Sequence, residues 1–183
     1  MIYQRLDKFS VPEGFRGRGA ITVQLWWIIQ STLFACSPQF AYKWRASLLR
    51  MFGAKIGKNV IIRPSVKTTY PWKLTIGDNS WIGDNVELYT LGEITIGKNA
   101  VVSQRSYLCT GSHDHTSEAF DIYAKPIVIE DEAWVATDVF IAPGVIIGKG
   151  AVIGARSSVY KSMPSGMICT GSPAKPIKLR IES

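Results

Sequence analysis

Residues 141–158 read IAPGVI, IGKGAV and IGARSS, a six-residue phrase repeated three times without a gap. Each phrase begins with an isoleucine, and a Gly or Ala follows it. Hexapeptide periodicity is typical of a parallel β-helix, in which each flat side of a coil takes one hexapeptide and the aliphatic residue points into the shaft. The repeat therefore predicts an all-β chain built around a β-helix.

Related phrases lie further toward the N-terminus: IGKNVI from Ile56, IGDNSW from Ile76, IGDNVE from Ile82 and IGKNAV from Ile96. Apart from two small slips, aliphatic residues keep the six-residue register until Leu108, where the spacing to Ile129 is off by three residues. The polar stretch 111–125 fills this break and has no hydrophobic period. It therefore predicts a protruding loop, and long loops inside compact domains are commonly functional.

The repeat divides the chain into three parts. We expect a short α-helical N-terminal segment at 1–53, a β-helix at 54–169 that carries the loop 111–125, and a C-terminal tail at 170–183. With 183 residues and 46% hydrophobic content, the chain is long enough to bury one good core.

Two helices are predicted in the N-terminal segment. The first covers 23–36, and Pro38 ends it; the second covers about 39–52, with Gly53 as its C-cap. Neither reaches the roughly 20 residues that span a bilayer. The apolar residues of the second helix recur at helical spacing: Phe40, Trp44, Leu48 and Met51.

Most of the net charge of +7 lies in this segment. Residues 1–55 carry eight Lys and Arg against two acids, a net of +6, whereas the remaining 128 residues carry thirteen against twelve. A basic, Trp-rich helical pair can lie in the interface of an anionic membrane, or it can pack on the β-helix or a partner subunit. No nucleic-acid-binding motif accompanies the charge, so we expect no nucleic-acid partner.

The cysteines and the first residues of the chain indicate the cellular compartment in which we expect the protein. Cys36, Cys109 and Cys169 are odd in number and have neither metal-ligand nor redox spacing. The first residues lack an apolar run with a cleavage site. We therefore expect a cytoplasmic protein, either free or in peripheral contact with the inner face of the cytoplasmic membrane.

Both histidines of the chain, His113 and His115, lie in the protruding loop within TGSHDHT at 110–116. A histidine in a loop is commonly a solvated bystander. Here both occupy the long break in the register, which favours general acid–base catalysis, a task suited to a side chain with an unperturbed pKa of about 6.5.

A zinc site is the alternative interpretation of the same loop, because the spacing of the two histidines puts them on one side of an extended segment. Its further ligands would have to be Asp, Glu or Cys, since the chain has no third histidine. That shortage also argues against a carbonic anhydrase with three histidine ligands. We expect no metal requirement.

Several segments together resemble the hexapeptide-repeat O-acetyltransferases: the repeat itself, TGSHD from Thr110, PIVI at 126–129, AWV at 133–135, APGVIIG at 142–148 and GSPA at 171–174. Within that family nearly the whole chain is similar to the colanic acid biosynthesis acetyltransferases of exopolysaccharide gene clusters. The segments that narrow the resemblance to this branch are FRG at 15–17, QLWW at 24–27 and YPWKL at 70–74.

The resemblance implies a left-handed parallel β-helix, an exception to the right-handed crossover rule. It also implies a homotrimer with acetyl-CoA bound between adjacent shafts, so that each active site uses two subunits. The implied reaction is O-acetylation of a sugar, such as fucose, in a lipid-linked exopolysaccharide repeat unit. Two alternatives stay open: another small hydroxylated acceptor, and a non-catalytic β-helix scaffold or sugar-binding trimer.

The resemblance also assigns catalytic roles. His113 is the expected general base, and His115 is the alternative base. Asp114 can orient or stabilise a neighbouring histidine, or it can cap the loop as an Asx residue. A backbone N–H near Thr137 is expected to stabilise the oxyanion of the tetrahedral intermediate.

The expected contacts with acetyl-CoA follow from the same resemblance. They are Trp134 and Thr137 near the pantetheine, Ala155 on the coil wall, Tyr160 and Lys161 at the end of the groove, and the cations Lys161, Lys178 and Arg180 near the CoA phosphates.

The contacts that simpler sugar acetyltransferases make with their acceptor cannot be assigned to residues of this chain. The polar acceptor-binding positions of simpler sugar acetyltransferases fall here on Gly83 and Leu91. The polar candidates nearby are Asp84, Asn85, Tyr89 and Arg105.

Overall fold

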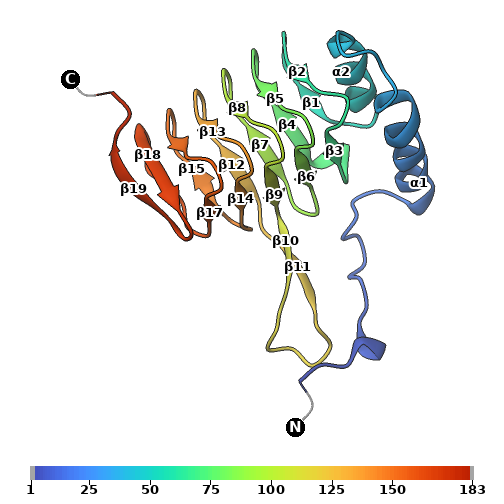
Figure 1. The fold of residues 1–183 in the computed structure, drawn as a ribbon. Helices are drawn as coiled ribbons and strands as arrows, with labels where there is room; N and C mark the ends of the chain where they lie inside the picture. Colours follow the sequence, from blue (N-terminus) through green and yellow to red (C-terminus); the bar gives the residue numbers. More distant parts are fainter. Residues whose placement is uncertain (1–2, 182–183) are drawn as a thin grey trace.

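The chain winds into a parallel β-solenoid of about six turns with helices at one end, as the repeat predicts (Figure 1). The structure, a computed structural model, describes residues 3–181. Residues 1–2 and 182–183, which we assigned to the N-terminal segment and the tail, lie outside the described residues.

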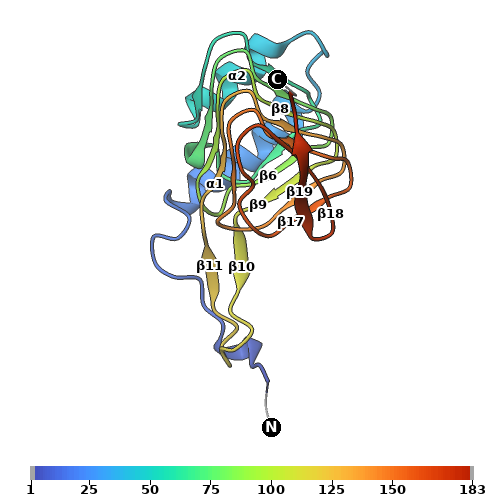
Figure 2. The same cartoon turned by 90° about the vertical axis from the view of Figure 1, so that its left-hand side faces the viewer.

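Three sheets form the sides of the solenoid, which Figure 2 views from its C-terminal end. Sheet A contains β1 (Lys55–Ile56), β4 (Leu74–Ile76), β7 (Ile94–Ile96), β12 (Ile127–Ile129) and β15 (Ile146–Ile147). Sheet B contains β2 (Ile61–Ile62), β5 (Trp81–Ile82), β8 (Val101–Val102), β13 (Trp134–Val135), β16 (Val152–Ile153), β18 (Met167–Gly171) and β19 (Ala174–Leu179). Sheet C contains β3 (Lys67–Thr68), β6 (Glu87–Tyr89), β9 (Tyr107–Cys109), β14 (Phe140–Ile141) and β17 (Ser158–Val159).

The phrase IGDN from Ile76 shows why the repeat folds in this way. Ile76 is buried in the shaft and lies in register with Ile96 of the next coil. A Cβ on Gly77 would lie 2.7 Å from the backbone carbonyl carbon of Gly97, so only glycine lets the coils stack there. Asn79 turns the corner with φ +59, a left-handed conformation that Asn tolerates better than most residues.

The first slip in the register has a local cause. The inward position that should follow Ile62 is taken by Thr68, a buried polar residue rather than an aliphatic one. The short 3-10 helix η3 (Pro71–Lys73) then adds residues at the corner before β4 begins. The coil is therefore complete although the aliphatic period lapses there.

Helices cover the open end of the first coil, and we call residues 20–51 the helical cap. The cap contains α1 (Ala20–Ile29), the π-helix η2 (Gln30–Phe34) and α2 (Tyr42–Met51); the 3-10 helix η1 (Leu6–Lys8) precedes it. The predicted helix 23–36 thus begins three residues earlier, at Ala20, and the predicted helix 39–52 begins later, at Tyr42. Gly53, the predicted cap residue, has φ +92 as that role requires.

The apolar residues that recur along the second helix do not form the side of the helix that packs on the coil. Only Leu48 of these four residues is buried, whereas Phe40, Trp44 and Met51 are exposed. The side of α2 that meets the coil carries Arg45, Ala46, Leu48 and Leu49.

Arg45 is the reason for this orientation. Its side chain is fully buried, and its guanidinium donates to the carbonyl oxygens of Ile62 (2.6 Å), Pro38 (2.8 Å) and Gln39 (2.6 Å). Burial lowers the pKa of Arg45, and these acceptors offset the loss of water around the charge. The guanidinium therefore joins the helical cap to the first coil.

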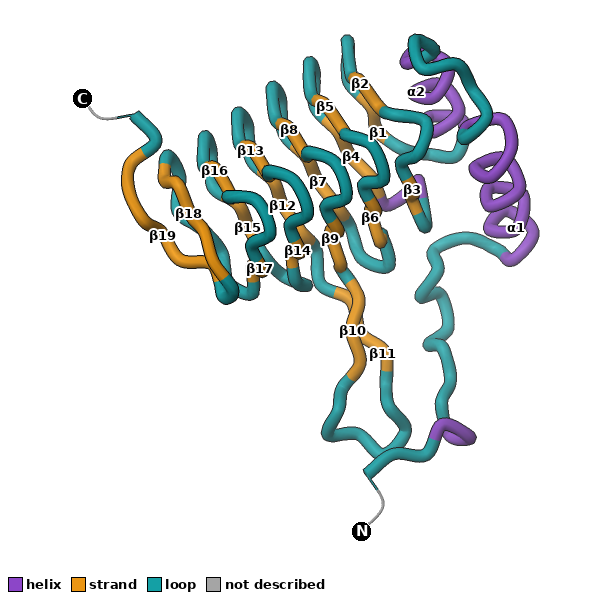
Figure 3. Tube along the Cα trace, in the orientation of Figure 1, coloured by secondary structure: helices purple, strands orange, loops and turns teal. Residues whose placement is uncertain are grey.

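The predicted protrusion is a β-hairpin rather than an irregular loop (Figure 3). It consists of β10 (Gly111–His113) and β11 (Ile122–Ala124), paired antiparallel. The Thr110 hydroxyl, at its base, donates to the carbonyl oxygen of Tyr89 over 2.5 Å. Because β12 pairs directly with β7, the shaft continues as if the hairpin were absent.

The C-terminal tail also differs from its predicted bounds. The boundary expected between 169 and 170 falls inside β18, and β19 returns antiparallel beside it. The tail therefore extends sheet B instead of leaving the shaft.

Two consecutive isoleucines of β15 test which positions of a strand point into the shaft. Ile147 is 0% exposed in the shaft, whereas Ile146 is 45% exposed on its outer side. We expect Ile147→Ala to lower the free energy of unfolding by about 2–5 kcal/mol through the cavity it leaves. The matched variant Ile146→Ala should cost less than about 1 kcal/mol. Chemical denaturation measures both, and equal losses would contradict this register.

Candidate functional site

The hairpin places His113 at the edge between sheets C and A. β10 leaves the corner that follows β9, and His113 is its last residue, half-buried near the hairpin tip. The imidazole stacks on the ring of Phe120 with centroids 4.1 Å apart and planes 9° apart. One aromatic face therefore holds the histidine ring in a single orientation.

A backbone carbonyl also selects the tautomer of this ring. Nδ1 of His113 lies 2.8 Å from the carbonyl oxygen of Phe120. A carbonyl oxygen can only accept a hydrogen bond, so Nδ1 must carry the proton and donate it. The lone pair of the neutral ring is then on Nε2, which is the arrangement that a general base requires. Phe120 adopts φ +55, an uncommon conformation for a bulky residue, at the position that supplies this acceptor.

Residues 3–19, which we call the N-terminal arm, run from the helical cap to the tip of the hairpin (Figure 1). The Arg5 amide donates to the carbonyl oxygen of Glu118 over 2.7 Å, and Lys8 Nζ lies 2.9 Å from the Glu118 carboxylate. The ring of Phe9 lies 5.7 Å from that of His113. The arm therefore holds the hairpin and supplies a second aromatic neighbour for the imidazole.

Asp114 and His115 lie on the solvent side of the same hairpin. Asp114 Oδ1 accepts hydrogen bonds from the Thr116 hydroxyl (2.6 Å) and amide (2.8 Å), and these bonds lower the pKa of the Asp114 carboxyl. Asp114 thus caps the turn, as the Asx interpretation expects. His115 is exposed. Residues 3–181 contain no cluster of three His, Cys, Asp or Glu side chains arranged to hold a metal ion.

Tyr89 is the acceptor candidate nearest the hairpin. It packs in a small apolar cluster with Leu91 and with Ile122 of β11. Burial is the main cause that raises the pKa of the Tyr89 phenol, and the neighbouring Cys109 adds to it. The phenol therefore stays protonated at neutral pH and can donate a hydrogen bond.

The other acceptor candidates lie at a different edge, between sheets B and C. Asp84 pairs with Arg63 Nε at 2.8 Å and accepts from the Ser65 hydroxyl at 3.0 Å. Asn85 and Arg105 are exposed corner residues with left-handed backbone, φ +56 and +60. Within one chain, the structure does not bring these three residues to His113.

Thr137 and Ala155 share that edge between sheets B and C. The Thr137 hydroxyl donates to the Gln104 carbonyl oxygen over 3.0 Å, and the Arg156 amide donates to the Thr137 carbonyl oxygen over 3.0 Å. The Thr137 amide makes no hydrogen bond to another residue within 3–181. The same holds for the Ala155 amide among these residues, so this edge offers a row of free N–H donors.

Trp134 and Lys178 lie on the outer face of sheet B. Trp134 pairs with Val152, Val152 pairs with Ile168, and Ile168 pairs with Lys178. The four residues therefore form one row across β13, β16, β18 and β19. The indole N–H of Trp134 donates to the Ser103 hydroxyl over 3.0 Å. The exposed indole and the lysine are thus on the face that adjoins the row of free amides.

Tyr160 and Lys161 form part of a pocket at the far edge of sheet C. The pocket has a volume of about 320 Å³, and Lys175 and Pro176 of β19 complete it. Arg180 does not join them, because it donates to the carbonyl oxygens of Glu132 and Gly150 at the edge between sheets A and B. Lys175 is a further cation of this pocket that the sequence analysis did not single out.

The other residues missed are the two aromatic neighbours of His113. Phe9 and Phe120 contact the His113 ring, yet neither carries a motif. Phe120 lies in the predicted loop, whereas Phe9 belongs to a segment without periodicity.

The fold and the site define the class of protein. Residues 126–161 match the family "Bacterial transferase hexapeptide (six repeats)", and residues 73–104 match "Hexapeptide repeat of succinyl-transferase". The chain belongs to the hexapeptide-repeat acetyltransferases.

One relative is similar over nearly the whole length. The chain is 67% identical to "Putative colanic acid biosynthesis acetyltransferase WcaF" of Escherichia coli (strain K12), over 98% of this chain and 99% of the relative.

Two solved structures share the fold and contain the donor or its product. The hexapeptide-repeat acetyltransferase VCA0836 of Vibrio cholerae, complexed with acetyl-CoA, matches with a TM-score of 0.81 and 26% identity over 91% of this chain and 92% of that one. A galactoside acetyltransferase in complex with coenzyme A matches with a TM-score of 0.80 and 25% identity over 93% and 84%.

The hydrogen bond to Phe120 predicts the tautomer of His113. Because the chain has two histidines, nitrogen-15 labelling of histidine alone gives a spectrum of two residues. Above the pH at which free histidine titrates, we expect His113 as the Nδ1–H tautomer, with the exposed His115 as the internal reference. Observing His113 as the Nε2–H tautomer would rule out the proposed geometry of the base.

Proposed function

We propose that the protein transfers the acetyl group of acetyl-CoA to a sugar hydroxyl, with His113 as the general base. The observation that carries this proposal is the hydrogen bond from Nδ1 of His113 to the Phe120 carbonyl, since it leaves Nε2 as the acceptor. The second support is the family itself, in which relatives have been solved with acetyl-CoA or coenzyme A.

The reaction needs one base and two bound substrates. Nε2 of His113 takes the proton of the acceptor hydroxyl while that oxygen attacks the thioester carbonyl carbon of acetyl-CoA. The tetrahedral intermediate then breaks its C–S bond, and the imidazolium returns the proton to the leaving CoA thiolate. The products are the acetyl ester and CoA, so no acyl-enzyme is needed when the base and both substrates are held together.

The oxyanion of the intermediate requires a donor. The free amide of Thr137 is suited to this role, and a single donor of this kind contributes roughly 3 kcal/mol in other enzymes. Trp134 is placed to pack on the pantetheine, with Lys178 on the same face for the phosphates. Ala155 forms the wall, and Tyr160 and Lys161 form the end of the groove with Lys175.

Two observations support a homotrimer with active sites between subunits. His113 and Thr137 lie at different edges of one chain, on either side of sheet C, so a site that uses both would take them from two chains. The outer face of sheet B also carries a row of apolar residues, of which Trp81 and Trp134 are exposed and the others half-buried in one chain. The row consists of Ile61, Trp81, Val101, Trp134, Val152 and Ile168.

The acceptor proposed is a sugar, such as fucose, in a repeat unit of a colanic acid-like exopolysaccharide, assembled on a lipid carrier at the cytoplasmic side of the membrane. The support is the 67% identity to the colanic acid biosynthesis acetyltransferase over nearly the full length. Tyr89 is the residue of this chain best placed to contact the acceptor, because it packs at the base of the hairpin.

The base is tested by His113→Ala with His115→Ala as the matched control in the same hairpin. We expect His113→Ala to lower kcat by about 10²–10⁴-fold, since general base catalysis contributes that much. His115→Ala should keep most of the activity. Thiol release from acetyl-CoA with a panel of fucosylated and galactosylated acceptors measures both. Full activity of His113→Ala would exclude it as the base, and no turnover of any acceptor by the wild type would favour a scaffold.

The donor site is tested by Trp134→Ala, with Trp44→Ala as the control. Both indoles are exposed, Trp134 on β13 of sheet B and Trp44 on α2 of the helical cap. We expect loss of the Trp134 indole to raise KM for acetyl-CoA by about tenfold, and loss of the Trp44 indole to leave it within about twofold. Steady-state kinetics with varied acetyl-CoA gives both values. An equal rise in the two variants would remove Trp134 from the proposed donor site.

A further inference from the structure

The helical cap turns an apolar face away from the shaft. We call this the cap face; it is made of large hydrophobic residues that are all exposed, namely Ile21, Leu25, Ile28, Leu33, Phe40, Trp44 and Met51. Ile21 is 86% exposed and Phe40 is 80% exposed. Contiguous apolar surface of this kind marks an interaction site more often than chance.

The exposed apolar residues of α1 lie along one side of a regular helix. In α1, Val23 and Trp26 point into the coil, and the Trp26 indole donates to the Thr68 carbonyl oxygen over 2.7 Å. Ile21, Leu25 and Ile28 are spaced by four and three residues, so they line the opposite side of the helix. The cap thus buries one apolar side and presents a second one.

The two helices join into one surface. The Trp44 indole of α2 donates to the Leu33 carbonyl oxygen of η2 over 3.1 Å. Between these two residues lies an open, largely apolar hollow that Pro38 and Ala41 also line. The cap face is therefore continuous across α1, η2 and α2.

The charge around the cap face has one sign. From Gly14 to Gly77 the sequence contains ten Lys and Arg and no Asp or Glu. Arg45 is buried, Lys73 is half-buried and Arg63 pairs with Asp84, so these three are committed elsewhere. The exposed cations of this stretch are Arg16, Arg18, Lys43, Arg50, Lys55, Lys58 and Lys67.

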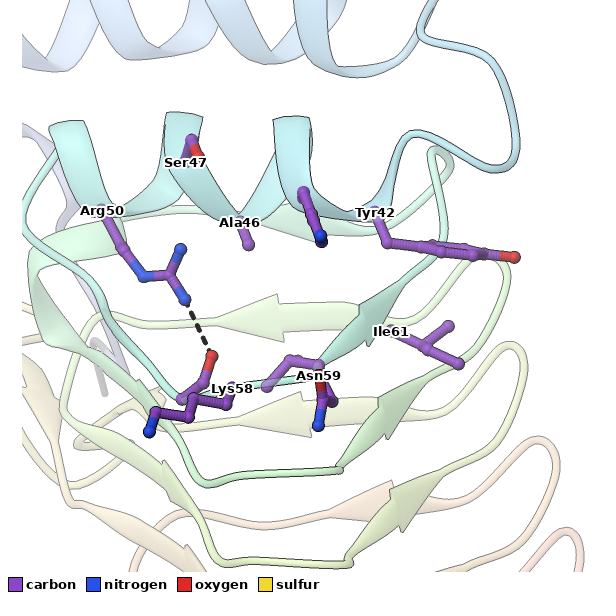
Figure 4. A pocket seen from close by; sticks show the side chains of 10 residues that line it. Tyr42, Ala46, Ser47, Arg50, Lys58, Asn59 and Ile61 are labelled. Atoms are coloured by element: carbon purple, nitrogen blue, oxygen red, sulfur yellow. Dashed lines mark hydrogen bonds between the residues drawn. The ribbon is translucent and has the colours of Figure 1, made fainter.

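Three of these cations line one pocket beside the cap face. The pocket has a volume of about 570 Å³ and lies between α2 and the first coil, with Lys43, Arg50 and Lys58 in its walls. Figure 4 shows Arg50 reaching down from α2 and Lys58 on the facing wall. Arg50 is held by the carbonyl oxygens of Ile56 and Gly57, each at 2.8 Å from Nη2. Nε also donates to the Ile56 carbonyl oxygen over 3.0 Å, so within residues 3–181 Nη1 is the nitrogen of this guanidinium left to donate to an anion.

We propose that the cap face is a docking surface for an anionic lipid bilayer, with lipid phosphate groups bound by the cations of this pocket. None of the helices in residues 3–181 has the length and apolarity to cross a bilayer, so contact would be peripheral. Large apolar side chains beside an uninterrupted set of cations are the composition of interfacial helices.

The same charge argues against a second copy of the chain as the occupant. Two cap faces brought together would place their exposed cations next to one another without acids between 14 and 77 to pair with them. An anionic membrane supplies the opposite charge and accepts the apolar side chains.

Vesicle binding by the full-length protein tests the proposal, without acetyl-CoA or acceptor, so the result is independent of the proposed reaction. Co-sedimentation is measured with phosphatidylcholine vesicles and with vesicles containing about one third phosphatidylglycerol. We expect binding mainly to the anionic vesicles. The double variant Leu25→Gln with Ile28→Gln should weaken it by about tenfold or more.

Matched controls come from the other end of the solenoid. Ile177 and Leu179 of β19 are also exposed, and Ile177→Gln with Leu179→Gln should bind as the wild type does. For the charge, Lys43→Gln with Lys58→Gln should weaken anionic-vesicle binding by about fivefold for each lysine. Lys98→Gln with Lys149→Gln should change it less than twofold, as both lie outside the cap.

Circular dichroism and size-exclusion chromatography of each variant show that fold and assembly are kept. Equal binding to neutral and anionic vesicles, or cap variants that bind as the wild type does, would overturn the proposal. So would a change of oligomeric state in the Leu25→Gln, Ile28→Gln variant, because the cap face would then join copies of the chain.

Discussion

Every coil of the shaft pairs directly with the coils above and below it, and this stacking constrains the rest of the molecule. Strands that pair lie about 4.8 Å apart, so each inward side chain is fixed by two neighbours of similar size. Ile76, Ile96, Ile129 and Ile147 form one such column in sheet A. The corners obey the same spacing, because Gly77 has no room for a Cβ. Function is therefore confined to what leaves the shaft or lies on its outer faces.

The shaft could be predicted because its constraint is local in sequence. A six-residue period reports inward positions directly, and its failure after Leu108 located the hairpin and both histidines. The partners of His113 could not be predicted in the same way. One partner is the backbone carbonyl of Phe120, which no pattern of side chains indicates. The other is Phe9, which lies in the N-terminal arm and meets His113 only in the folded protein.

The helical cap shows a different limit of prediction from sequence. Helical spacing identified an apolar face on Phe40, Trp44 and Met51 but could not say which side packs on the coil. The outcome depends on Arg45, whose guanidinium finds buried carbonyl oxygens only once the first coil has formed. The side of α2 that packs on the coil thus combines a buried, hydrogen-bonded charge with the apolar residues Ala46, Leu48 and Leu49. Strand register, which the hexapeptide period alone does not give for the tail, brings Trp134 and Lys178 into one row on sheet B.

The hairpin begins and ends at one corner, and the shaft passes beneath it without a change of register. It is joined to the shaft by the hydrogen bonds of Thr110, by the amide of Lys125, which donates to the Thr110 carbonyl oxygen over 2.9 Å, and by the packing of Ile122 with Tyr89 and Leu91. Residues 111–124 therefore behave as a cassette. Exchange of this cassette for that of a relative would change the surroundings of His113 while the shaft folds unchanged.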